Sequence, residues 1–320
     1  MPILFACTAS RLRFATVSPV RLTETDLELV AALQEDGRAS FESLAGRVGL
    51  SRKAVRSRVL RLIADGVVRV VATVRPDFDG IHANAYLSVS VIGARRDEIA
   101  RTLAEQDEAV FVSIVAGQAS VVAEIRTTDL GRVRDLVDRL RGTDGVTAVE
   151  TIVYTDVVKE PHLPPPLTTG GAAPTIDQTD RTLVDLLRRD GRASYAELAA
   201  HVGLSAAATR ARVRHLLDCG VARIVTLVNP TKLGRSVMTG FALDLDGPAP
   251  DVLARIGEIA AVDFLARTLG SADAVGTIVT TTTEDTIAVL DRIGTLAGVA
   301  GLRSWTHLRL VQERYGAPGA

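Results

Sequence analysis

Apolar residues recur every three or four positions from 26 to 35, which predicts an amphipathic helix. A second short helix is predicted after its N-cap Ser40, and Gly49 ends it. A third helix is predicted after its N-cap Ser51, and Gly66 is placed to end it in the left-handed conformation. Three helices with a tight turn between the second and the third form a helix-turn-helix pattern.

The segment that follows carries short apolar runs that alternate with amphipathic stretches. Elements are predicted at 85–91, 95–106, 110–115, 121–127, 129–140 and 146–157, of which the second and the fifth are helices. This βαββαβ order is typical of an antiparallel split-βαβ sheet with helices on one face, the ferredoxin-like arrangement. The expected fold class is therefore α+β.

The whole pattern occurs twice. Residues 23–51 align without a gap onto 177–205, an offset of 154 residues that takes Asp26 to Asp180. The later elements are predicted again at 237–245, 250–260, 262–269, 274–280, 284–296 and 299–311. The period is too long for a solenoid repeat, and each copy has enough chain for two small domains.

The predicted organisation is a tandem duplication of a (winged) helix-turn-helix domain and a ferredoxin-like domain. The predicted parts are a loose N-terminal tail 1–21, helix-turn-helix domains 22–80 and 176–234, ferredoxin-like domains 81–158 and 235–315, and a linker 159–175. The linker is rich in proline and glycine, which exclude helix and favour a spacer. A ligand for a proline-binding module is the alternative interpretation of its PPP run.

Composition restricts the function classes. The net charge of -1 means that a nucleic-acid partner must be recognised through a local basic face rather than the whole chain. The two cysteines, Cys7 and Cys219, stand far apart with no CxxC pattern, so we expect neither disulfides nor a metal site, and a reducing cytoplasm fits best. The opening run LFAC lacks a basic segment before it and is too short to span a bilayer, so no membrane association is expected.

The third predicted helix of the first copy has such a basic face. Its apolar residues lie on one side, whereas Lys53, Ser57 and Arg61 lie on the opposite side, and no acidic residue occurs from 51 to 61. The helix therefore fits a major groove lined by phosphates, although a solvated surface is the alternative interpretation. The candidate DNA-binding residues are Ser51, Arg52, Lys53, Arg56, Ser57, Arg58 and Arg61 in the first copy, with Ser205, Arg210, Arg212 and Arg214 in the second.

The second copy has a weaker reading face. Ala207, Ala211 and His215 take the places of the outward residues of the first copy. Alanine methyl groups contact thymine methyl groups but make no hydrogen bonds to bases. We expect the second copy to bind DNA weakly or to serve as a scaffold.

The stretches DGRASFESLAGRVGLSRKAVRSRVLRLIADGVV and DGRASYAELAAHVGLSAAATRARVRHLLDCGVA both resemble the DNA-binding segment of the Lrp/AsnC family of transcriptional regulators. The resemblance implies a sequence-specific regulator of double-stranded DNA that self-associates through its ferredoxin-like domains and responds to an amino acid or a similar small effector. It implies no cofactor and no catalytic residue.

The same resemblance locates an effector site at an interface turn, which by position is 117–120 in the first copy and 270–273 in the second. The family pattern has glycine followed three residues later by aspartate, so Asp273 keeps it and Ser120 departs from it. The candidate effector-binding residues are Gly117, Ser120, Gly270, Ser271 and Asp273. A hairpin turn that needs glycine's conformational freedom is the alternative interpretation of both turns.

Two other functions remain as alternatives. Siroheme decarboxylases are built from paired subunits that resemble this family, and such an enzyme would explain the duplication. The histidines of this chain, His82, His162, His201, His215 and His307, are scattered and form no evident acid-base constellation. The third alternative is a small-molecule-sensing scaffold that has lost DNA binding.

Overall fold

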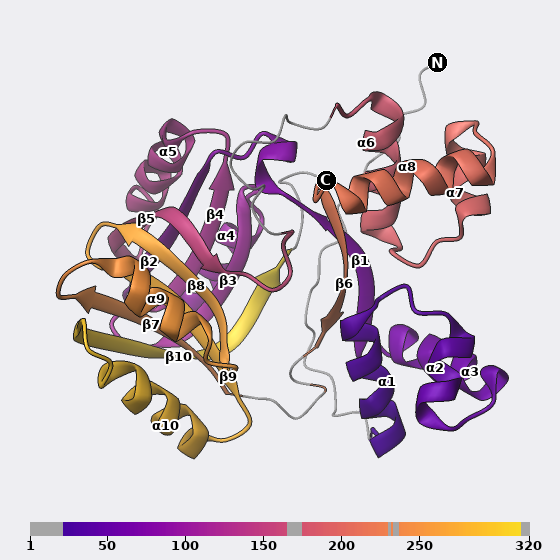
Figure 1. The fold of residues 1–320 in the computed structure, drawn as a ribbon. Coiled ribbons are helices and arrows are strands. Elements are labelled where there is room, and N and C mark those ends of the chain that lie inside the picture. Colours follow the sequence, from indigo (N-terminus) through magenta and orange to yellow (C-terminus); the bar gives the residue numbers. More distant parts are fainter. Residues whose placement is uncertain (1–21, 165–174, 230–231, 233–236, 315–320) are drawn as a thin grey trace. The chain divides into compact units, whose positions relative to one another are not determined.

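The computed structural model describes residues 22–164, 175–229, 232 and 237–314 (Figure 1). The described chain forms two compact units, and each unit contains parts of both copies. The helix-turn-helix unit lies within 18–78 and 162–234, and the ferredoxin-like unit lies within 79–161 and 235–320. The predicted tail and most of the predicted linker lie outside the described residues.

The helix-turn-helix unit contains two three-helix bundles. The helices are α1 (Glu24–Glu35), α2 (Phe41–Val48) and α3 (Arg52–Ala64) in the first copy, and α6 (Gln178–Arg189), α7 (Tyr195–Val202) and α8 (Ala206–Asp218) in the second. The predicted helices are confirmed, although α1 begins two residues earlier than expected. It does so because Thr23 and Asp26 form a reciprocal capping box at its N-terminus.

The strand that follows each bundle pairs with its counterpart in the other copy. Strands β1 (Val68–Val74) and β6 (Ala222–Val228) form a two-stranded antiparallel sheet. Each strand also completes the core of the other copy, because Val228 packs against the first bundle and Ala72 and Val74 pack into the second. The two bundles are therefore held as one unit.

Two arginines hold the bundles to each other reciprocally. Arg38 donates to the carbonyl oxygens of Gly191 and Ala193 at 2.6 and 2.8 Å. Arg192 donates at the same two distances to the carbonyls of the equivalent residues, Gly37 and Ala39. Each guanidinium also stacks on an aromatic ring of the opposite copy, at about 5 Å from its centre.

The ferredoxin-like unit contains eight strands. They are β2 (Ala83–Val91), β3 (Ala109–Ala116), β4 (Val121–Thr127) and β5 (Val146–Lys159) in the first copy, and β7 (Val237–Leu245), β8 (Val262–Leu269), β9 (Ala274–Thr280) and β10 (Val299–Glu313) in the second. Each copy has the strand order of the predicted ferredoxin-like fold. Antiparallel pairing of β5 with β8 and of β10 with β3 closes the two sheets into one barrel, in the order β10-β3-β4-β2-β5-β8-β9-β7.

Four helices cover the outer face of this barrel (Figure 1). They are α4 (Arg96–Ala104), α5 (Leu130–Arg141), α9 (Ala249–Gly257) and α10 (Thr283–Gly294), and the short helix η1 (Pro76–Asp79) precedes β2. The second-copy helices end two to three residues before the predicted ends, because the sequence there carries no clear stop signal. No helix in the described ranges is both long and apolar enough to cross a membrane.

The barrel has a core on each side of its wall. Outside, each pair of helices packs on its own sheet and forms a separate apolar cluster. Inside, a third cluster joins both copies and includes Tyr86, Ile152, Phe264 and Trp305. The interior of the barrel is thus a contact between the two copies.

Candidate DNA-binding surface and effector site

The turn between α2 and α3 sets the geometry of the reading helix. Gly49 adopts a left-handed conformation (φ 67°), which glycine tolerates without strain. The Ser51 hydroxyl then accepts a hydrogen bond from the Ala54 amide at 3.3 Å and caps α3. Gly203 and Ser205 repeat both features in the second copy.

The N-terminal half of α3 presents free cationic groups. Arg52, Lys53, Arg56 and Ser57 are exposed. Within the described residues, the side chains of the first three make no hydrogen bond or ion pair with the protein. The first turn of α3 has no acidic residue, and the helix N-terminus itself attracts anions. This surface is therefore suited to a phosphate backbone.

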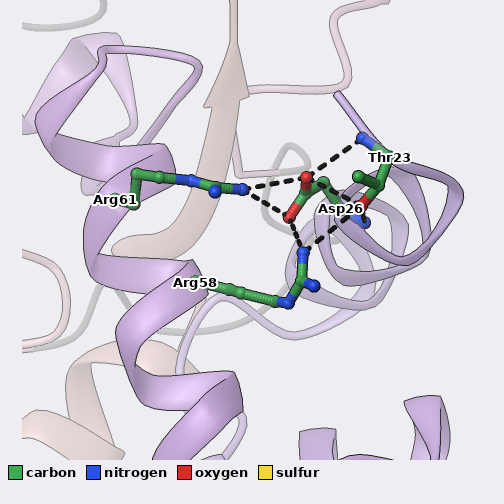
Figure 2. A network of polar contacts seen from close by, with 4 residues as sticks. All are labelled: Thr23, Asp26, Arg58 and Arg61. Carbon is green, nitrogen blue, oxygen red and sulfur yellow. Dashed lines mark hydrogen bonds and ion pairs between the residues drawn. The ribbon is translucent and has the colours of Figure 1, made fainter. Parts of the chain in front are cut away.

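The other two predicted arginines of α3 have a partner inside the protein (Figure 2). Arg58 contacts the Asp26 carboxylate at 3.0 Å, and Arg61 contacts both of its oxygens at 2.9 Å. The Asp26 side chain is fully buried, and it also accepts hydrogen bonds from the Thr23 amide and hydroxyl at 3.0 and 2.8 Å. The sequence pattern predicts Arg61 on the DNA-reading face with Arg58 among the DNA-binding residues; in the structure both guanidinium groups instead contact Asp26 of α1.

Asp26 anchors the reading helix, and the sequence pattern did not single it out. Burial acts to raise its pKa, but the hydrogen bonds from Thr23 and the charges of Arg58 and Arg61 lower it below the ordinary value. The ionised carboxylate fixes the orientation of α3 relative to α1. The signal that could have revealed it is the T-x-x-D spacing of a capping box, repeated as D-x-x-D at 177–180.

The second copy keeps only part of this network. Arg212 contacts Asp180 at 2.9 Å and Asp177 at 2.8 Å, whereas His215 stands in the place of Arg61. The outward face of α8 carries exposed Ala207 and Ala211. Arg210 and Arg214 are exposed beside them, and their side chains make no hydrogen bond or ion pair with the described residues. The two reading helices therefore differ both in surface and in anchoring.

The predicted effector turns lie in the ferredoxin-like unit, where each turn packs against the other copy. A side chain on Gly117 would come within 2.8 Å of Trp305, and one on Gly270 within 3.3 Å of Ile152. Both glycines also have positive φ angles, 156° and 143°. Close approach of the two copies therefore accounts for both glycines without a ligand.

Ser120 and Asp273 share one structural task. The Ser120 hydroxyl accepts a hydrogen bond from the Val91 amide at 3.2 Å, and the Asp273 carboxylate accepts one from the Leu245 amide at 2.7 Å. Ser120 is buried, whereas Asp273 and Ser271 are exposed. Each side chain satisfies the last amide of a neighbouring strand.

The fold thus consists of paired helix-turn-helix domains and a closed pair of ferredoxin-like domains, and its segments match known family models. The AsnC-type helix-turn-helix domain matches residues 22–63 and 176–217, and the Lrp/AsnC ligand binding domain matches residues 84–164. The chain belongs to the Lrp/AsnC family of helix-turn-helix transcriptional regulators.

Similar proteins match one copy at a time. An uncharacterized HTH-type transcriptional regulator of Pyrococcus abyssi is 30% identical over 150 residues, which are 46% of this chain and 95% of that protein. The HTH-type transcriptional regulator LrpA of Mycobacterium tuberculosis is 33% identical over 146 residues, which are 45% of this chain and 97% of that protein.

Solved structures of one enzyme match the tandem arrangement. The crystal structure of the siroheme decarboxylase NirDL has a TM-score of 0.65 over 92% of this chain and 95% of that chain, at 12% identity. This likeness shows a shared fold. Among the described residues, no cluster of histidine, cysteine or carboxylate side chains is arranged to hold a metal ion.

Proposed function

We propose that this transcriptional regulator binds double-stranded DNA mainly through α3 of the first copy, and that α8 of the second copy makes a weaker contact. The observation that carries the proposal is the contrast between the two faces. Helix α3 exposes Arg52, Lys53 and Arg56 without partners in the described protein, whereas α8 exposes alanines at the first two of these positions and at Ala211. Positive side chains at a helix N-terminus attract phosphates, and alanines do not.

The ion pairs of Asp26 with Arg58 and Arg61, which we call the clamp, support this division of roles. Because Arg58 and Arg61 are both ion-paired with Asp26, these arginines hold the reading helix in place and leave DNA contact to Arg52, Lys53, Arg56 and Ser57. The reciprocal arginine contacts fix the spacing between the two bundles, so the protein should select half-sites at one separation. Because the reading helices α3 and α8 differ in sequence, we expect the two DNA half-sites to differ in sequence as well.

The ferredoxin-like unit is proposed to bind an amino acid or a similar small effector beside the turns 117–120 and 270–273. The hydrogen bond from the Leu245 amide already uses the Asp273 carboxylate, which makes Asp273 a supporting residue of the turn. We further propose that the protein works in the cytoplasm and has no catalytic activity. A siroheme-decarboxylase-like enzyme and a scaffold without DNA binding are the alternatives.

Binding titrations against DNA at several salt concentrations separate these functions. Fragments are first selected from a random pool by the wild-type protein. Helices α3 and α8 together expose five free cationic side chains, four arginines and one lysine. If all five contact phosphates, the logarithm of the binding constant should fall with the logarithm of the salt concentration at a slope of about −4 to −5, because each neutralised phosphate contributes about −0.9.

The experiment has one control variant, and two results would contradict the proposal. Arg141→Ala, on the exposed end of α5, should leave the slope unchanged. Absence of selected, salt-dependent binding would support the scaffold. Conversion of added siroheme, followed by its absorption spectrum, would support the enzyme.

A further inference from the structure

A cavity of about 430 Å³ lies inside the ferredoxin-like barrel and is lined by residues of both copies. Its volume is within the range of small-molecule sites. Gln118 and Ala119 of the first turn and Ser271 of the second line it, so it joins the two predicted effector turns in one place. The glycines of these turns, by contrast, pack against the protein.

The aromatic residues of the cavity occupy unequal positions in the two copies. Strand pairing places Tyr86 opposite Ile152 in the first copy and Gly240 opposite Trp305 in the second. The large aromatic residue therefore lies on the first strand of the first copy (Tyr86 in β2) but on the last strand of the second copy (Trp305 in β10). A side chain on Gly240 would come within 2.2 Å of the Trp305 ring, so only glycine leaves room for the indole. The Tyr86 and Trp305 rings lie 5.8 Å apart and form an apolar wall.

The charged residues of the cavity are exchanged in the same way. Glu150 pairs with Ser88 on the first copy, and at the equivalent position of the second copy Arg303 pairs with Ala242. A dimer of identical subunits would place the same charge at both positions. The fused chain instead places one carboxylate and one guanidinium in the lining of a single cavity. The terminal Arg303 nitrogen donates to the Ser271 carbonyl oxygen and contacts the Asp244 carboxylate at 3.3 Å, which leaves its Nε for a ligand.

Three buried polar atoms of the cavity wall make no proper hydrogen bond with the described protein: Tyr86 Oη, Trp305 Nε1 and Arg303 Nε. The indole approaches the hydroxyl, but an indole N–H only donates, so the hydroxyl proton keeps no acceptor. Tyr86 is only 8% exposed. A buried donor without an acceptor is costly, and a ligand carboxylate at Arg303 can accept a hydrogen bond from its Nε.

We propose that this cavity binds one amino acid with a large apolar side chain per chain, with its carboxylate at Arg303, its ammonium group at Glu150 and its side chain against Tyr86 and Trp305. The inference rests on the proposed effector role of the ferredoxin-like unit and is independent of DNA reading. It assigns ligand binding to the space between the copies, in place of two equivalent turn sites.

Calorimetry of the full chain without DNA tests the proposal, with the twenty common amino acids as probes. Trp305 is the only tryptophan, so its fluorescence reports occupancy by the non-fluorescent probes. We expect at least one large apolar amino acid to bind at one molecule per chain and to change this fluorescence. The matching amine and carboxylic acid, each lacking one charged group, should bind about tenfold or more weakly.

Variants of the charged cavity residues sharpen the result. Arg303→Gln and Glu150→Gln should each weaken binding about tenfold or more, whereas Arg309→Gln, which removes a guanidinium paired with Asp97 outside the cavity, should not. Both cavity positions are partly open to solvent, so circular dichroism should show folded variants. Binding by none of the twenty probes, two equivalent sites per chain, or equal affinity in Arg303→Gln and Arg309→Gln would each overturn the proposal. Loss of DNA binding alone would not affect it.

Discussion

The two copies are alike where their helix-turn-helix bundles hold each other and unlike where they face outward or line the cavity. Arg38 and Arg192 make reciprocal contacts at matching distances, and β1 pairs with β6 over seven residues. On the reading helices, by contrast, alanine replaces Lys53, and His215 replaces Arg61. Contacts between the copies require both partners to stay compatible, whereas a reading helix depends only on its own copy.

Gene fusion explains how such differences can persist. In a dimer of identical chains every substitution appears twice, so opposite charges cannot occupy equivalent positions. In the fused chain Glu150 and Arg303 do occupy equivalent positions, and so do Tyr86 and Gly240. The divergence is therefore a property of the single chain and can be tested copy by copy.

The largest expected effect is an equal loss of stability when either of the two reciprocal arginines is substituted. Arg38→Ala and Arg192→Ala should each lower the free energy of unfolding of the helix-turn-helix unit by about 2–3 kcal/mol, because each removes two charged hydrogen bonds and a ring contact. Chemical denaturation measures both losses. Arg52→Ala, which removes an exposed side chain from the same unit, should change stability by less than about 0.5 kcal/mol. Clearly unequal losses at 38 and 192 would show that the copies do not hold each other symmetrically.

A smaller and unequal effect is expected at the buried aspartates. Asp26→Asn should destabilise by about 2 kcal/mol and Asp180→Asn by about 1 kcal/mol, because Asp26 contacts two arginines and Asp180 contacts one. Denaturation of both variants gives the difference. His215→Arg should add the missing partner in the second copy and increase the loss at Asp180. Equal losses of stability from the two substitutions would show that the contact of Arg61 with Asp26 does not stabilise the first copy.

The barrel interior is expected to give pH effects of opposite sign from the two copies. Burial, with the nearby carboxylates of Glu124, Asp263 and Glu313, raises the pKa of Glu160 to about 7 against the opposing charge of Arg126. The folded state then keeps a proton that the unfolded chain has lost, so this contribution to stability falls as the pH rises from about 4.5 to 7.

The second copy supplies the opposite contribution. Burial lowers the pKa of His307 to about 4, so the unfolded chain takes up the proton first and stability falls as the pH drops from about 6.5 to 4. Relative to wild type, Glu160→Gln should make the unfolding free energy rise more steeply with pH, and His307→Phe should make it rise less steeply. Denaturation at pH 4.5, 5.5 and 7 checks both slopes. Parallel pH profiles in the two variants and the wild type would show that Glu160 and His307 do not cause the pH dependence of stability.

The secondary structure and the duplication could be predicted because they depend on local patterns. Caps such as Ser51 and turns such as Gly49 act within a few residues, and the structure confirms them. Asp26 was missed because its partners lie 32 and 35 residues away and a polar residue near a helix start is usually solvated. The cavity was missed because it depends on the pairing of β10 with β3 and of β5 with β8, which no local pattern reveals.

The central claim is that the first copy dominates DNA binding, and matched arginine substitutions test it most directly. Arg56 and Arg210 are equivalent exposed residues of α3 and α8. Fluorescence anisotropy with one selected DNA fragment at one salt concentration gives the affinities of Arg56→Ala and Arg210→Ala. We predict a loss of about 1–3 kcal/mol for Arg56→Ala and a clearly smaller loss for Arg210→Ala. Equal losses from the two substitutions would contradict the account.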